Sequence, residues 1–257
     1  NIDLSVGAIY AICAIILLDS MTWPMFAGLG NWVIPVAWCL ALLTGLVLGA
    51  INGLIVWKTG VDAFIVTLGG FLVWRNVAWY LTDGQTIGPL DSTFMMFGGT
   101  NGTLGTSLSW ILGLVATALA LLTLWNSRRA KLAHEFPVKP LWAEGALALI
   151  ISGAILGFVA ILNAYEIPSR RLARMFEARG EVMPEGFTQG YGLPISVLIL
   201  IAVAVVMTIV ARRTRLGRYI FATGGNPDAA ELSGINTRLL TVKIFAIMGF
   251  LCALSAV

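Results

Sequence analysis

The sequence predicts an all-α, polytopic transmembrane helix bundle with a short cytoplasmic coupling helix. Hydrophobic residues make up 58% of the 257 residues and charged residues only 11%, whereas a soluble domain carries about 25% charged residues. Apolar runs of about 20 residues, enough to cross a bilayer core, recur along the chain. Runs such as 146–162 and 198–210 are apolar on every side, which argues against the alternating pattern of a β-barrel. Together these observations exclude an ordinary soluble enzyme.

About seven membrane helices are expected. In chain order the apolar runs cover residues 2–18, 32–57, 61–81, 107–125, 143–165, 193–211 and 244–257. The chain opens at Asn1 without a cleavage site and stops at Val257 within an apolar run. We therefore expect a single transmembrane domain over residues 1–257, truncated at both ends.

The charges of the connections predict their sides of the membrane. Residues 126–142 hold four Lys or Arg against one Glu, and residues 212–243 hold six against two acidic residues. Such basic loops are typical of the cytoplasmic side. Alternation then puts three connections outside, at 19–31, 82–106 and 166–192. The last holds four arginines and four glutamates, and its pattern near 170–179 fits a surface amphipathic helix and a solvated loop equally well.

Glycines at four-residue spacing predict close packing between helices. Small residues allow two helix backbones to approach each other within a membrane. The expected packing positions are Gly45, Gly49 and Gly53, with a second pair at Gly153 and Gly157.

The few polar residues inside the apolar runs are candidates for a translocation path. Asn52 lies beside the glycine stripe, and Arg75 lies deep within the third run. Because such side chains are costly in hydrocarbon, we expect both to face the bundle interior, a partner or a watery path. For Arg75 a structural hydrogen-bonding role and a path role both stay open. The path candidates are Asn52, Thr67, Arg75 and Asn76.

No catalytic, metal or nucleotide site is expected in this chain. Cys13, Cys39 and Cys252 lie in apolar runs without zinc-ligand spacing. Motifs for zinc proteases, serine hydrolases and ATP phosphate loops are missing from the sequence. His134 lies in a basic loop, and acidic residues flank the runs, which disfavours coupling to an ion gradient. We expect no bound cofactor and no nucleic-acid partner.

The segment GGNPDAAELSGIN, residues 224–236, specifies a short helix in the longer basic loop. Asn226 suits the N-cap and Pro227 the first helical position. Asp228 favours the positive end of the helix dipole, and Gly234 suits the left-handed conformation that ends a helix. Spacing alone supports an ordinary loop helix and a docking element equally.

Four segments carry motifs in a recognisable order. They are IDLSVGA at 2–8, GAINGLIV at 49–56, FIVTLGG at 64–70 followed by Arg75 and LTDGQTI at 81–87, and GRYIFATGGNPDAAELSGIN at 217–236. In the same order they resemble segments of the membrane permeases of bacterial ABC importers for simple sugars such as ribose, arabinose, galactose and xylose. Asn76 departs from this pattern, since many relatives have glycine there.

The resemblance implies that the short helix is a coupling helix seated in a groove of a partner ATPase. The loop is similar to the E-A-A-x-x-x-G-x9-I element of ABC importers, with Asp228 in place of the usual Glu. The implied docking residues are Asn226, Pro227, Asp228, Ala229, Ala230, Leu232, Gly234 and Ile235.

The resemblance also implies the function: a multi-pass permease of the bacterial cytoplasmic membrane that moves a sugar by alternating access and is not itself an enzyme. The implied partners are ABC ATPase subunits, which use ATP and Mg, an extracytoplasmic sugar-binding protein, a second permease copy and membrane lipid. The long insertions at 126–140 and 166–192 resemble the xylose branch, so xylose is the expected sugar. The alternatives are an ion-coupled secondary sugar carrier and an intramembrane or lipid-modifying enzyme. The first requires a midplane carboxylate and the second a catalytic pair, and the sequence offers neither.

Overall fold

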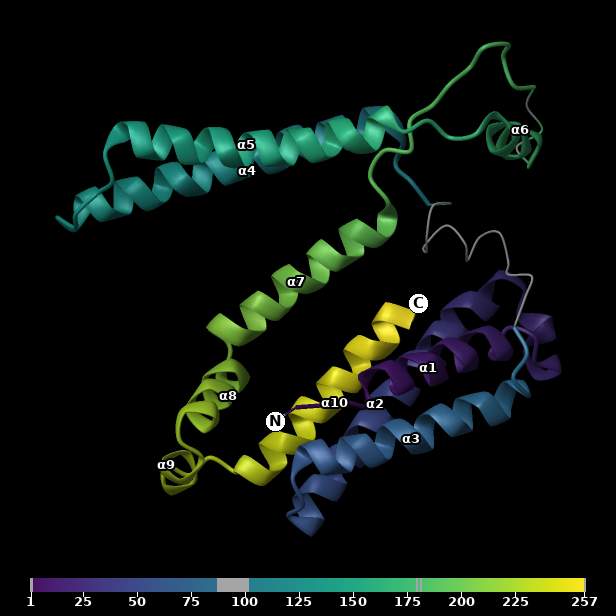
Figure 1. The fold of residues 1–257 in the computed structure, drawn as a ribbon, viewed down its shortest axis with the longest axis vertical. Coiled ribbons are helices and arrows are strands. Elements are labelled where there is room, and N and C mark those ends of the chain that lie inside the picture. Colours follow the sequence, from purple (N-terminus) through teal and green to yellow (C-terminus); the bar gives the residue numbers. More distant parts are fainter. Residues whose placement is uncertain (1, 87–101, 179, 181, 257) are drawn as a thin grey trace. The chain divides into compact units, whose positions relative to one another are not determined.

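The computed structural model of the chain describes residues 2–86, 102–178, 180 and 182–256 (Figure 1). In this part of the chain the elements are helices, joined by loops with three isolated β-bridges. In order they are α1 (Val6–Ser20), η1 (Pro24–Trp32), α2 (Val33–Thr59), α3 (Ala63–Thr82), α4 (Gly105–Ala133), α5 (Leu141–Ala164), α6 (Ser169–Ala178), α7 (Ile195–Arg213), α8 (Arg215–Gly225), α9 (Pro227–Leu232) and α10 (Thr237–Ala256).

Six of the described helices are long and apolar enough to cross a membrane, namely α2, α3, α4, α5, α7 and α10. Helix α1 is a shorter apolar helix of 15 residues. The predicted all-α, polytopic architecture is therefore confirmed. Several predicted features fall outside the described residues: most of the 82–106 connection, Ile87 of the third motif, and Arg179 and Glu181 of the 166–192 loop.

The chain divides into two compact units. One holds α1, η1, α2, α3, the second part of α7, and α8 to α10, while the other holds α4, α5, α6 and the first part of α7.

In the first unit α2 packs along α10, and α1 contacts α2, α3 and α10 (Figure 1). The buried centre of these contacts combines Ile9 and Cys13 of α1 with Cys252 and Ala253 of α10. The two ends of the described chain thus share one core, and α1 is held by three neighbours although it is short.

In the second unit α4 and α5 lie side by side as a helical hairpin (Figure 1). Arg128 Nη1 at the end of α4 lies 2.5 Å from Glu144 Oε2 in the first turn of α5. A Cβ at Gly113 would lie 2.8 Å from Val159 Cγ2, so the helices are close there. The connection predicted at 126–142 is shorter than expected, because α4 continues to Ala133 through residues of good helix propensity.

The 166–192 loop of this unit is folded. It contains α6, which confirms the amphipathic helix expected near 170–179 over a plain loop. The side chain of Leu172 is only 2% exposed, and Phe176 packs edge-on against Phe187 at 5.5 Å between ring centroids. At the end of the loop the Ser109 hydroxyl accepts a hydrogen bond from the Leu193 N–H at 2.7 Å. The loop is therefore anchored to the start of α4.

Candidate functional site

Helix α9 has the local structure that its sequence predicts. The Asn226 side chain accepts a hydrogen bond from the Ala229 N–H at 3.1 Å, and Pro227 occupies the start of the helix. The helix ends before Gly234, whose φ of +83° lies in the left-handed region. The Gly234 N–H donates to the Glu231 carbonyl at 2.9 Å. The result is a six-residue helix with a cap at its start and a left-handed residue just after its end.

One side of α9 is buried against the chain, and the other side is exposed in the part of the chain that the structure describes. Ala230 is only 3% exposed, so this residue packs against the rest of the chain, and its docking role stays a prediction. Leu232, in contrast, is 90% exposed. The exposed residues around it are Asn226, Pro227, Asp228, Ala229 and Gly234, and Ile235 is half-buried. Burial of Leu232 by a partner would remove this apolar side chain from water.

Two capped helices flank α9, and the first was missed by the sequence analysis. Helix α8 begins after Thr214, whose hydroxyl accepts from the Gly217 N–H at 3.3 Å. A Cβ at Gly217 would collide with the Ala211 carbonyl, so the α7 to α8 turn is tight. The sequence signal for the start of α8 is Thr214, a residue type suited to the N-cap, three residues before Gly217. On the other side, Asn236 accepts from the Leu239 N–H at 2.8 Å and starts α10.

The glycine stripe of α2 lies directly against α10. A Cβ at Gly45 would meet the Gly249 carbonyl, and a Cβ at Gly49 would meet the Phe245 carbonyl. Gly53 is also tight, with 2.8 Å between the Cβ position and Val242 Cα. Gly249, which is not among the predicted packing positions, is the matching small residue on α10. In the sequence, the indication of this contact is a single glycine within the apolar run 244–257.

The second predicted pair, Gly153 and Gly157 on α5, is placed differently. Nothing lies within 4 Å of the Cβ position at either glycine. In the described part of the chain these two glycines make no close helix contact, so their packing role stays a prediction.

Asn52 and Thr67 are buried in a hydrogen-bonded network at the start of α1. Asn52 is 1% and Thr67 0% exposed. The Asn52 amide donates to the Ser5 hydroxyl at 2.9 Å, and that hydroxyl donates to the Asp3 carboxylate at 2.6 Å. The Leu4 N–H donates to Thr67 Oγ1 at 3.1 Å. The network joins the N-terminal segment to α2 and α3, which is a structural use of these polar groups.

Arg75 and Asn76 lie on the exposed side of α3. The Arg75 guanidinium sits 5.9 Å from the centre of the Phe71 ring, and the Asn76 amide donates to the Leu72 carbonyl at 2.7 Å. Both contacts stay within α3. The structure therefore does not bring the four path candidates together: two are buried and two are exposed.

Within the described ranges, no cluster of three or more His, Cys, Asp or Glu is arranged to hold a metal ion. In the first unit the buried side chains of Asn52 and Thr67 join separate segments, whereas Trp74 Nε1 has no hydrogen-bond partner among the described residues.

Comparison with known proteins identifies relatives over the whole chain. The family model described as "Branched-chain amino acid transport system / permease component" matches residues 1–257. The xylose transport system permease protein of Haemophilus influenzae is 30% identical over 99% of this chain and 59% of that protein. The corresponding protein of Escherichia coli K12 is 31% identical over 99% of this chain and 56% of its own length.

The ribose import permease protein of Haemophilus influenzae is 28% identical over 99% of this chain and 51% of that protein. The chain thus spans little more than half the length of these curated relatives. No solved structure matches the chain.

Proposed function

Since the chain belongs to the family of permease components described for branched-chain amino acid transport systems, we propose that it is the permease subunit of an ATP-driven ABC importer for a simple sugar. The family match and the six apolar helices indicate a multi-pass inner-membrane protein. The proposed subunit binds no cofactor of its own. ATP and Mg are used by partner ATPase subunits on the cytoplasmic side.

The observation that carries this proposal is the exposed, capped helix α9. A transport protein that has no ATP phosphate loop of its own needs a surface element to which an ATPase can bind. Helix α9 supplies one, because Ala230 is buried and Leu232 is 90% exposed. Asp228 in the first turn adds a negative charge at the positive end of the helix. We assign α9 and its flanking residues as the ATPase dock.

The contacts of α9 suggest how its movement reaches the membrane. Only the short turn from Ser233 to Asn236 separates α9 from α10. Helix α10 in turn lies against α2 at the contact of Gly249 with Gly45. In this mechanism, ATP-driven closure of the ATPases moves α9, and α10 and α2 move with it as one pair. Alternating access follows from the tilt of that pair.

A second permease copy is assigned to the exposed side of α3. Arg75 and Asn76 lie there within a helix of membrane length. A guanidinium that faces hydrocarbon costs several kcal/mol by insertion scales, about 2.5 to 3.5. This side of α3 is therefore proposed to face the second copy and the path between the two copies.

The proposed substrate is xylose, on the basis of the relatives. The proteins of Haemophilus influenzae and Escherichia coli that match nearly the whole chain are xylose transport system permeases. A ribose import permease matches with lower identity. The sugar is proposed to arrive on an extracytoplasmic binding protein, for which α6 offers the exposed Arg170 and Arg174.

Docking is tested by co-purification of the tagged protein with candidate ABC ATPases. Asp228→Lys places a positive charge at the positive end of α9, and we expect at least fivefold less retained ATPase, since the dipole interaction alone contributes up to about 1 kcal/mol. Glu135→Lys is the control, because it reverses a charge on another connection expected in the cytoplasm. Equal retention by the two variants would contradict a dock at α9.

Transport is tested by uptake of radiolabelled pentoses and hexoses into cells that express the complete system. Uptake is expected for xylose and is expected to stop when ATP is depleted. Uptake that survives ATP depletion would instead identify an ion-coupled carrier. Uptake of another sugar in preference to xylose would overturn the substrate and leave the importer proposal standing.

A further inference from the structure

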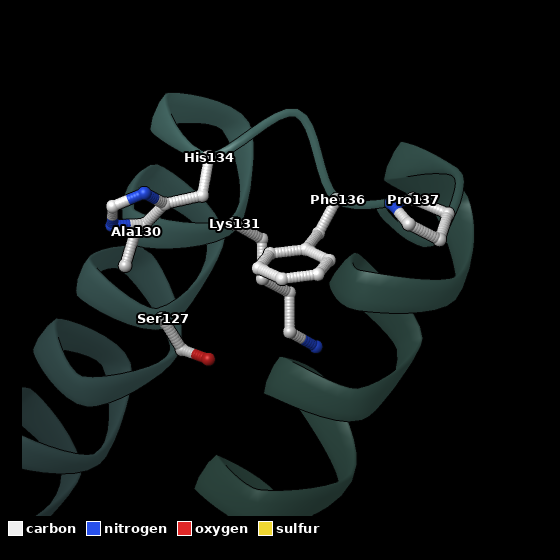
Figure 2. A pocket seen from close by; sticks show the side chains of 6 residues that line it. All are labelled: Ser127, Ala130, Lys131, His134, Phe136 and Pro137. Carbon is white, nitrogen blue, oxygen red and sulfur yellow. The ribbon is translucent and has the colours of Figure 1, made fainter.

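A hollow lies at the end of the α4–α5 hairpin that carries the basic connection. Its volume is about 500 Å³, and it is lined by Ser127, Ala130, Lys131, His134, Phe136 and Pro137 (Figure 2). Ser127, Ala130 and Lys131 share one face of α4, since the last two follow Ser127 by three and four residues, and His134 directly follows the last residue of the helix. The chain then turns back, and the Phe136 N–H donates to the Lys131 carbonyl at 2.9 Å.

The lining combines an apolar floor with polar groups at one edge. Figure 2 shows the Phe136 ring beside the stem of Lys131. In this view the Lys131 ammonium and the Ser127 hydroxyl are the lowest polar groups among the labelled side chains, and the His134 ring lies above them. A ligand that fits this lining has an anionic group joined to carbon-rich chains.

The surroundings of the hollow are positively charged. Residues 126–144 hold four Lys or Arg and two Glu. Arg128 pairs with Glu144, the one salt bridge in the part of the chain that the structure describes. Arg129 stacks over Trp125 at 5.3 Å from the ring centre. Lys131 therefore faces the hollow without a carboxylate at ion-pair distance among the described residues.

The depth of the hollow in the membrane follows from its aromatic neighbours. Trp125 on α4 and Trp142 on α5 are 56% and 77% exposed. Exposed tryptophans of membrane proteins concentrate at the level of the lipid headgroups. The basic charge of the same connection places it on the cytoplasmic side, where anionic lipids attract juxtamembrane cations.

We propose that this hollow binds the phosphate of an anionic phospholipid. Lys131 pairs with the phosphate, and the Ser127 hydroxyl, which lines the same hollow, donates a hydrogen bond to one of its oxygens. Phe136 and Pro137 pack against the glycerol and the first acyl carbons. The apolar lining favours a lipid over a free phosphate, which would require polar groups on all sides. The inference goes beyond the proposed function and needs only the membrane placement of the hairpin.

The test compares lipid contacts of the purified protein in vesicles of phosphatidylcholine with a minor fraction of phosphatidylglycerol. A spin-labelled phosphatidylglycerol probe reports its preference for the protein surface relative to spin-labelled phosphatidylcholine. Lys131→Gln is expected to reduce this preference about fivefold. Lys58→Gln, at the end of α2, removes the same charge away from the hollow and is expected to leave most of the preference intact.

A second variant tests the apolar contact. Phe136→Ala keeps the charge and is expected to shorten the residence of the phosphatidylglycerol probe. Equal effects of Lys131→Gln and Lys58→Gln would overturn the proposal in favour of diffuse surface charge, as would an unchanged probe in Phe136→Ala. Displacement of the probe by inorganic phosphate would assign the hollow to a soluble phosphate compound and overturn the lipid assignment.

Discussion

A few polar side chains of the first unit join separate segments of the chain. Asn52, Ser5 and Asp3 form a chain of hydrogen bonds between α2 and the start of α1. Thr67 ties the same segment to α3. Buried polar groups need such partners, because an unpaired donor or acceptor costs about 1 to 3 kcal/mol. The Asp-Leu-Ser motif thus has a physical role in fixing α1.

A substitution at Asn52 separates this structural role from a path role. Asn52→Ala removes the donor to the buried Ser5 hydroxyl, and we expect a loss of about 1 to 3 kcal/mol of stability. Thermal unfolding of the purified protein measures it. Asn76→Ala, whose amide bonds only within its own helix, is expected to change stability by less than about 0.5 kcal/mol. Normal stability of Asn52→Ala with impaired uptake would instead place Asn52 in the path.

Glycine positions with the same spacing differ in what surrounds them. A side chain at Gly49 would meet the Phe245 carbonyl, whereas a side chain at Gly153 would meet nothing within 4 Å. The close contact between α2 and α10 therefore depends on the absence of Cβ atoms at the α2 glycines. At Gly153 and Gly157 of α5, no contact within 4 Å depends on the absence of a Cβ atom.

Gly49→Val is expected to force α2 and α10 apart at a cost of about 1 to 3 kcal/mol. Thermal unfolding is the measurement, and Gly153→Val is the matched control on another apolar helix. A similar loss of stability in both variants would mean that helix propensity explains the effect and the close contact does not.

At the scale of elements, α9 is a short helix held between α8 and α10. Its start is fixed by Asn226 and its end by the left-handed Gly234. Nothing lies within 4 Å of the Cβ position of Gly234, so a larger side chain there fits in space and acts only on the backbone. This position tests the rigidity of the element without a steric clash.

Gly234→Val should strain the backbone by about 1 to 2 kcal/mol and shift the end of α9. We expect ATP hydrolysis by the assembled transporter to continue while sugar uptake falls. The control is Gly224→Val in the last turn of α8, where φ is not positive and the Cβ position is also open. Undiminished uptake by the Gly234 variant would argue against force transmission through this turn.

For the whole molecule, the alternation of helices and the basic connections predict one orientation. The α9 region and the α4–α5 connection are expected inside, and the folded loop that carries α6 outside. That outer loop is compact, with the Ile167 N–H bonded to the Gln189 carbonyl at 2.8 Å.

Labelling from either side of the membrane tests this orientation. In a background with Cys13, Cys39 and Cys252 replaced by alanine, the exposed positions Ser233 and Thr188 are changed one at a time, as Ser233→Cys and Thr188→Cys. A membrane-impermeant maleimide added to intact cells should label only Thr188→Cys. Labelling of Ser233→Cys in intact cells would refute the orientation and with it the ATPase dock.

The sequence alone determined the features that depend on local chemistry. Apolar runs predicted the membrane helices, because a segment that crosses lipid must be apolar along its whole length. Residues at the ends of α9 predicted its cap and its stop, since both act within one helical turn. Helix α8 and the extension of α4 also arise from local signals. Both segments are polar, so the search for apolar runs did not identify them as helices.

Only the tertiary structure decided which of several similar residues meet a neighbour. Gly45 lies against Gly249, about 200 residues further along the chain, while Gly153 faces open space. Asn52 is buried against Ser5, while Asn76 is exposed on α3. The spacing of a motif fixes the face of a helix on which a residue lies, but the element that covers this face comes from a distant part of the chain. That pairing depends on how complete helix surfaces fit together.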